Sequence, residues 1–180
     1  VNIPKLTPHF SATHMSWGAV DEMMAASAYT QLAFYTSNKE LSKLLLRMSK
    51  DERRHQSFYY SQAEKRLQHP LAQAICATAL RVFWNPVGMG VGEDTTLGFI
   101  AALLYDDERG REDLARMDRL MAKLPGLGWF NRVSLEVGKA IDMFRAAEPE
   151  RAREIYEKKQ VIARERQAMP ENPDFALTSA

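Results

Sequence analysis

The stretch Asp51-Glu52-Arg53-Arg54-His55 places a carboxylate and an imidazole three residues apart inside a long segment with helical periodicity. Residues three apart share a face of an α-helix, so Glu52 and His55 are positioned to hold one metal ion. An ionised carboxylate on an apolar face is costly unless it is paired or bound to a cation. The face that contains both residues is apolar, being formed by Leu41, Leu44, Leu45, Met48, Tyr59 and Ala63.

The preceding helical segment has a second carboxylate, Glu22, at the centre of its own apolar face. Glu22 lies about 15 residues before the turn at 36–38, and Glu52 lies about 14 residues after it. At a rise of about 1.5 Å per residue, an antiparallel pair of helices brings both carboxylates to the same level. We therefore expect Glu22, Glu52 and His55 to converge and point inward. The alternative is a buried hydrogen-bonded pair of Glu22 and His55 without metal.

Helical periodicity extends over the whole chain, and no segment shows the alternation of a β-strand. We expect an all-α fold with a four-helix bundle and additional helices, in one domain spanning residues 1–168. Residues 1–10 are expected to be irregular, and residues 169–180 to form a flexible tail. Proline, glycine and capping residues delimit the predicted helices. These are expected at about 15–35, 39–67, 71–84, 94–108, 129–145 and 149–168. Gly110 is expected to kink or split the fourth helix, with a segment continuing to 123.

Composition excludes several classes of function. The net charge of +1 over 180 residues argues against an electrostatic nucleic-acid binder. No apolar run approaches the roughly 20 residues of a membrane span. The only cysteine, Cys76, excludes a disulfide within the chain and favours a reducing compartment, so a cytoplasmic location is expected.

These residues resemble the ferritin-like superfamily, the di-iron carboxylate four-helix bundles that include rubrerythrins and acyl-carrier-protein desaturases. Three motifs resemble an actinobacterial ferritin-like group of unestablished activity more narrowly. They are His14-Met15-Ser16-Trp17-Gly18, Glu52-x-x-His55-x-x-Phe58-Tyr59 and Trp84-x-Pro86-Val87-Gly88. The resemblance is strongest over residues 14–67. It implies that Glu22, Glu52 and His55 are iron ligands.

The second half of the chain departs from that pattern, because it has no second Glu-x-x-His. Its nearest substitutes are Asp106 and Glu136, which are separated by the same 30 residues as Glu22 and Glu52 (136 − 106 = 52 − 22). They are candidate ligands of a second metal. Glu136 has an alternative role as the partner of Lys139 in an i,i+3 ion pair.

The sequence therefore predicts a non-haem metalloprotein with one or two iron ions, or manganese. It would activate oxygen or peroxide, as an oxidase, desaturase or hydroxylase of a small apolar substrate. Tyr59 is the candidate catalytic residue, one turn beyond His55. The alternative is a degenerate scaffold with a structural metal or none, which binds a lipid or a protein. A homodimer is also considered, and no electron donor is indicated.

Overall fold

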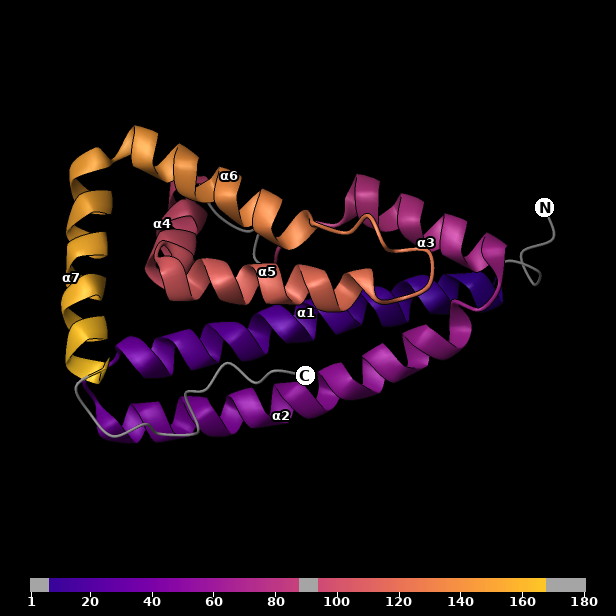
Figure 1. Cartoon of the computed structure of the whole chain (residues 1–180), viewed down its shortest axis with the longest axis horizontal. Coiled ribbons are helices and arrows are strands. Elements are labelled where there is room, and N and C mark those ends of the chain that lie inside the picture. Colours follow the sequence, from indigo (N-terminus) through magenta and orange to yellow (C-terminus); the bar gives the residue numbers. More distant parts are fainter. Residues whose placement is uncertain (1–6, 88–93, 168–180) are drawn as a thin grey trace.

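The computed structural model describes residues 7–87 and 94–167, and all regular structure in those ranges is α-helical. The all-α prediction is thus confirmed. The expected tail at 169–180 lies outside the described residues. The seven helices, seen in Figure 1, are α1 (Thr7–Tyr35), α2 (Lys39–Arg66), α3 (Pro70–Phe83), α4 (Asp94–Tyr105), α5 (Glu108–Ala122), α6 (Arg132–Ala147) and α7 (Pro149–Gln167).

The two longest helices, α1 and α2, form an antiparallel hairpin (Figure 1). Asn38 begins α2, because its side-chain oxygen accepts hydrogen bonds from the backbone N–H groups of Glu40 and Leu41 at 3.1 Å each. Two serines of α2 are buried against α1 and donate to its carbonyl oxygens. Ser42 Oγ donates to Ala33 and Ser49 Oγ donates to Ala26, each at 2.9 Å. Small residues on α1 permit this close approach of the helices.

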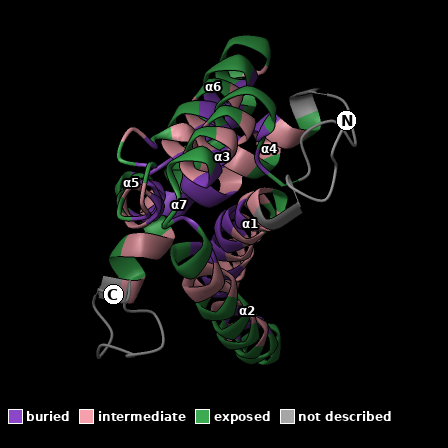
Figure 2. Ribbon diagram, turned by 90° about the vertical axis from the view of Figure 1, so that its right-hand side faces the viewer, coloured by how far each residue is buried: buried purple, intermediate pink, exposed green. Residues whose placement is uncertain are grey.

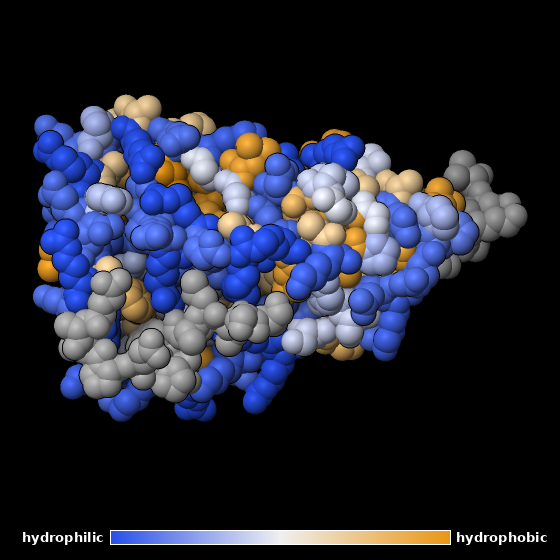
Figure 3. Space-filling view, viewed as in Figure 1, coloured by the Kyte–Doolittle hydropathy of each residue, from blue (hydrophilic) through white to orange (hydrophobic). Residues whose placement is uncertain are grey.

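Helices α3, α4, α5 and α7 also contact α1, which is the central helix, and α6 packs on α4, α5 and α7 (Figure 2). In both views α2 lies at the edge of the molecule and packs chiefly on α1. For this reason the predicted four-helix bundle is not confirmed within one chain. Figure 3 shows that the face viewed in Figure 1 is mainly hydrophilic around α7. No helix in residues 7–87 and 94–167 is long and apolar enough to cross a membrane.

Three helix boundaries differ from the sequence-based ranges. Helix α1 already begins at Thr7, because Pro8 falls in its first turn, where a missing N–H costs nothing. The expected irregular lead-in at 7–10 is therefore wrong. Helix α4 ends at Tyr105 and α5 begins at Glu108, because the Asp107 carboxylate accepts from Gly110 N at 2.7 Å and caps a new helix. Of the two expectations at Gly110, a kink or a split, the structure has a split, which lies just before the glycine. Helix α6 begins at Arg132, three residues later than 129.

The start of α6 is capped from another helix. Asn131 precedes α6 but makes no side-chain capping bond. Instead, the buried Asp118 carboxylate of α5 accepts from Val133 N at 2.9 Å and from Ser134 N at 3.0 Å. Burial raises the pKa of Asp118, against the opposing effect of these hydrogen bonds. Asp118 therefore joins α5 to α6 through two otherwise unsatisfied N–H groups.

We expect Asp118→Ala to lower the free energy of unfolding by about 1–3 kcal/mol, because it removes a helix cap and leaves buried donors unpaired. The control is Asp142→Ala on α6, whose side chain is 77% exposed and pairs with Arg145 at 3.5 Å. That change should stay within about 0.5 kcal/mol. Urea denaturation measures both, and equal losses would contradict the capping role.

Candidate metal centre

Glu22 of α1 and the Glu52 and His55 side chains of α2 converge at one point of the hairpin. One donor atom from each lies within 4.8 Å of the others. His55 Nδ1 is 2.8 Å from Glu52 Oε2 and 3.8 Å from Glu22 Oε2. The predicted matching of depth along the two helices is thus confirmed. Glu22 and His55 do not form the hydrogen-bonded pair that was the alternative to a metal site. The Nδ1 atom of His55 is within hydrogen-bond distance of Glu52 instead.

The cluster opens toward solvent on one side. The side chains of Glu22 and Glu52 are 24% and 22% exposed, and that of His55 is 58% exposed. The expectation that all three point into a closed bundle is therefore wrong for His55. The reason is that α2 lies at the edge of the molecule. No other helix among the described residues covers the side of α2 that carries His55.

The two carboxylates carry more negative charge than the site neutralises. Burial raises the pKa of Glu22, and the hydrogen bond and charge of Glu52 raise it further. The hydrogen bond with Glu52 raises the pKa of His55, and the charge of Glu22 adds to it. The neighbouring arginines turn to other partners, since Arg54 pairs with Asp51 at 2.8 Å and Arg53 donates to Thr30 at 3.3 Å. A bound cation would relieve this excess.

The donor set fits a hard or borderline metal ion. Carboxylate oxygen and imidazole nitrogen are the ligands of iron and manganese in proteins. Bonds of about 2.0–2.2 Å join donors that are at most about 4.4 Å apart, so the observed spacing needs only small side-chain rotations. The open side leaves coordination positions for water or a substrate molecule.

Tyr59 lies beside the cluster, packed on Gly18 of α1. A Cβ atom at position 18 would lie 2.6 Å from the Tyr59 ring, so only glycine allows this contact. The His14 ring approaches the same tyrosine edge-on, with 6.0 Å between centroids. Tyr59 therefore fills the space beside Gly18, one turn before Glu22. Its catalytic role stays a prediction.

The structure does not bring Asp106 and Glu136 to the cluster. The buried Asp106 side chain accepts from Arg145 Nε at 3.1 Å, and Arg111 approaches it at 3.6 Å. Glu136 pairs with Arg132 at 2.7 Å and with Lys139 at 3.1 Å. The ion pair of Glu136 with Lys139 was the alternative to a metal role. Both carboxylates are thus neutralised by basic side chains.

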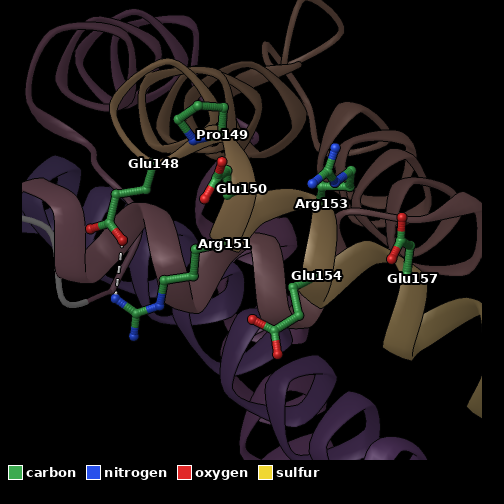
Figure 4. Close-up of a pocket in the computed structure, with 7 residues that line it drawn as sticks. All are labelled: Glu148, Pro149, Glu150, Arg151, Arg153, Glu154 and Glu157. Atoms are coloured by element: carbon green, nitrogen blue, oxygen red, sulfur yellow. Dashed lines mark hydrogen bonds and ion pairs between the residues drawn. The ribbon is translucent and has the colours of Figure 1, made fainter.

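Two of the hollows in the described part of the chain bear on the site, and the three donors line neither of them. An apolar hollow of about 260 Å³ lies between α1, α4 and α6. Part of its lining is formed by Ala25, Tyr29, Pro86 and Val87. Ala25 and Tyr29 follow Glu22 on the same side of α1. The other, of about 760 Å³, is an open charged surface at the start of α7 (Figure 4). There Arg151 pairs with Glu148 at 3.2 Å, and the acidic side chains do not converge.

Sequence reasoning missed two buried polar networks on the opposite side of α1. Asp113 of α5 accepts a hydrogen bond from Ser27 and pairs with Arg116 at 2.6 Å. Lys159 of α7, whose side chain is 3% exposed, pairs with Asp107 at 2.7 Å. The polar residues in the middle of α1 were the available signal for the first network. For the second, the signal was a lysine on the same helical face as the apolar residues Ala152 and Ile155 of α7.

No protein-family model matches the chain, and no curated protein and no solved structure does so. The ferritin-like resemblance therefore stays a prediction from the residues quoted above.

Proposed function

We propose that this protein is a ferritin-like non-haem metalloprotein in which Glu22, Glu52 and His55 hold iron, or manganese, for oxygen or peroxide chemistry. The observation that carries the proposal is the convergence of three donor atoms within 4.8 Å, beside an open side. When bound there, iron would supply the activation of oxygen. The α1–α2 hairpin corresponds to half of the ligand set of a ferritin-like bundle, a Glu on one helix and a Glu-x-x-His on the next.

The side chains of the cluster determine its net charge and the orientation of the His55 ring. Glu52 orients the His55 ring through the 2.8 Å contact at Nδ1. Glu22, with its raised pKa, holds a proton more readily than an ordinary glutamate does when no cation is bound. Metal binding requires the deprotonated carboxylates and neutral imidazole, so the affinity should fall as pH is lowered through the raised pKa of His55.

The hollow between α1, α4 and α6 supports a small apolar substrate. Its volume of about 260 Å³ suits a small molecule, and its lining is mainly aliphatic. Ala25 is one turn from Glu22 on the same face of α1, so a molecule seated there would lie near the cluster. Tyr59, whose ring packs on Gly18 one turn before Glu22, remains the candidate for proton or electron transfer.

The first test is the metal content of protein purified without chelator, combined with oxygen consumption after addition of ferrous iron. We expect about one iron per chain and oxygen uptake above the rate of free iron.

His55→Ala should lower the metal affinity at least ~10–100-fold, because it removes a ligand. The control is His69→Ala. His69 caps α3 by accepting from Leu71 N at 3.1 Å, so its loss should cost stability but no metal. Equal metal content in the two variants would refute the site, and no metal in the wild type would favour the scaffold.

A second test compares the two halves of the chain. Glu52→Gln should reduce bound metal at least ~10-fold, because a neutral amide is a weaker ligand. Glu136→Gln should leave metal content nearly unchanged, since Glu136 is held by Arg132 and Lys139. Metal analysis of both variants at one pH decides this. Equal loss of metal would mean that Glu136 is also a ligand.

A third test uses the excess charge of the metal-free site. The raised pKa of Glu22 means that the folded protein binds this proton more tightly than the unfolded chain. Ionised Glu22 therefore lowers stability as pH rises above the ordinary value of 4.5. We expect Glu22→Gln to raise the Tm of chelator-treated protein, by more as pH rises through the raised pKa of Glu22, and to abolish stabilisation by added metal.

The control for that test is Glu40→Gln on α2, whose side chain is 82% exposed and pairs with Lys43 at 2.8 Å. It should change neither the Tm nor the response to metal. A lower Tm for Glu22→Gln than for wild type, without metal at pH 7, would contradict the electrostatic argument.

A further inference from the structure

The outer stripe of α2 carries both metal donors and large apolar side chains. Leu44 lies two turns before Glu52 and is 53% exposed, and Leu41 is 42% exposed. Phe58, one turn after His55, is 56% exposed. The helix is otherwise strongly polar, so this stripe is its unpartnered apolar side. Exposed apolar side chains that gather along one stripe mark an interaction surface.

Across α1, the loop after α3 and helix α4 also expose apolar side chains. Val87 is 59% exposed and Ile100 is 43% exposed. Both line the apolar hollow with Ala25 and Tyr29 of α1. Together, the stripe of α2, the adjoining side of α1 and these two residues form what we call the open face. It is defined by Leu41, Leu44, Phe58, Ala25, Tyr29, Val87 and Ile100, and the three donors lie within it.

The metal site on this face is half of a symmetric set. A two-metal carboxylate centre uses two single glutamates and two Glu-x-x-His pairs. One chain supplies Glu22, Glu52 and His55, and no further cluster of donors exists in residues 7–87 and 94–167. Asp106 and Glu136 are already paired with basic groups. The missing donors are of the same types as those present, so a second copy of this chain is the occupant that provides them.

We propose that two copies of this chain pack through the open face about a twofold axis, each contributing Glu22, Glu52 and His55 to one shared two-metal centre. The proposal rests on the proposed function, since it requires that these residues bind metal. A twofold axis places the same patch on both partners, as an isologous interface needs. The stripe of α2 then packs against the partner's α1, and the two hairpins form the four helices that one chain lacks.

Metal should control this association. Without metal, the axis would bring four carboxylates together, and like charges repel at short distance. Two divalent ions supply four positive charges and remove the repulsion. A ligand that binds only the dimer shifts the equilibrium toward it by mass action. The protein is therefore expected to be mainly monomeric with chelator and dimeric with metal.

The experiment is sedimentation velocity on the full chain, with chelator and then with added Mn²⁺, together with metal analysis of each species. We expect metal to tighten dimerisation at least ~10-fold and the dimer to carry about two ions. A monomer that binds one ion per chain would overturn the shared centre and leave the proposed metal function standing. A chain that binds no ion would overturn both.

The variant pair Leu44→Glu and Leu135→Glu tests the face itself. Leu44 is on the open face and is no ligand, and Leu135 of α6 is 42% exposed and does not line the hollow. Leu44→Glu should weaken both dimerisation and metal binding at least ~10-fold, whereas Leu135→Glu should change neither. Thermal unfolding with chelator checks that both variants fold as the wild type does. Wild-type metal affinity in a folded Leu44→Glu monomer would overturn the proposal.

Discussion

The alignment of α2 against α1 is the constraint on which the rest of the structure depends. Asn38 fixes where α2 begins, and Ser42 and Ser49 fix how deep it lies on α1. Once the two helices are held at that spacing, Glu22 and Glu52 must meet at one level. Neither carboxylate is forced there by its own local preference. The contacts along the hairpin offset the electrostatic repulsion between the two carboxylates.

The two sides of α1 divide structural and chemical roles. On one side, Ser27 bonds Asp113, and Tyr35 donates to Asp107, which also pairs with Lys159. These groups satisfy one another within the chain and tie α1 to α5 and α7. On the other side, Glu22 faces Glu52 and His55, and the cluster is open to solvent. The pKa of Glu22 is raised there. Buried polar groups that are fully paired stabilise a fold, whereas unbalanced charge near the surface is available for a ligand.

Much of the first half was predictable from the sequence, because its signals are local. The helical repeat placed Glu52 and His55 on one face, and counting residues from the turn placed Glu22 at their level. The second half depended on tertiary partners that counting cannot supply. The 30-residue spacing of Asp106 and Glu136 suggested a repeat, but Arg145 and Arg132 neutralise these two carboxylates. The break at Asp107 was hidden for a similar reason, because its carboxylate serves both Gly110 and Lys159.

The capped start of α2 has a consequence for how this chain can diverge. Apart from the buried Ser42, Leu45 and Ser49, most side chains between Asn38 and Glu52 face solvent, so their identities are weakly constrained. The length of that segment is not. One inserted or deleted residue would turn every later side chain by about 100° and shift it by about 1.5 Å along the axis. Glu52 and His55 would then both point away from Glu22. Evolution can therefore replace the exposed residues of this segment but cannot change its length by one residue.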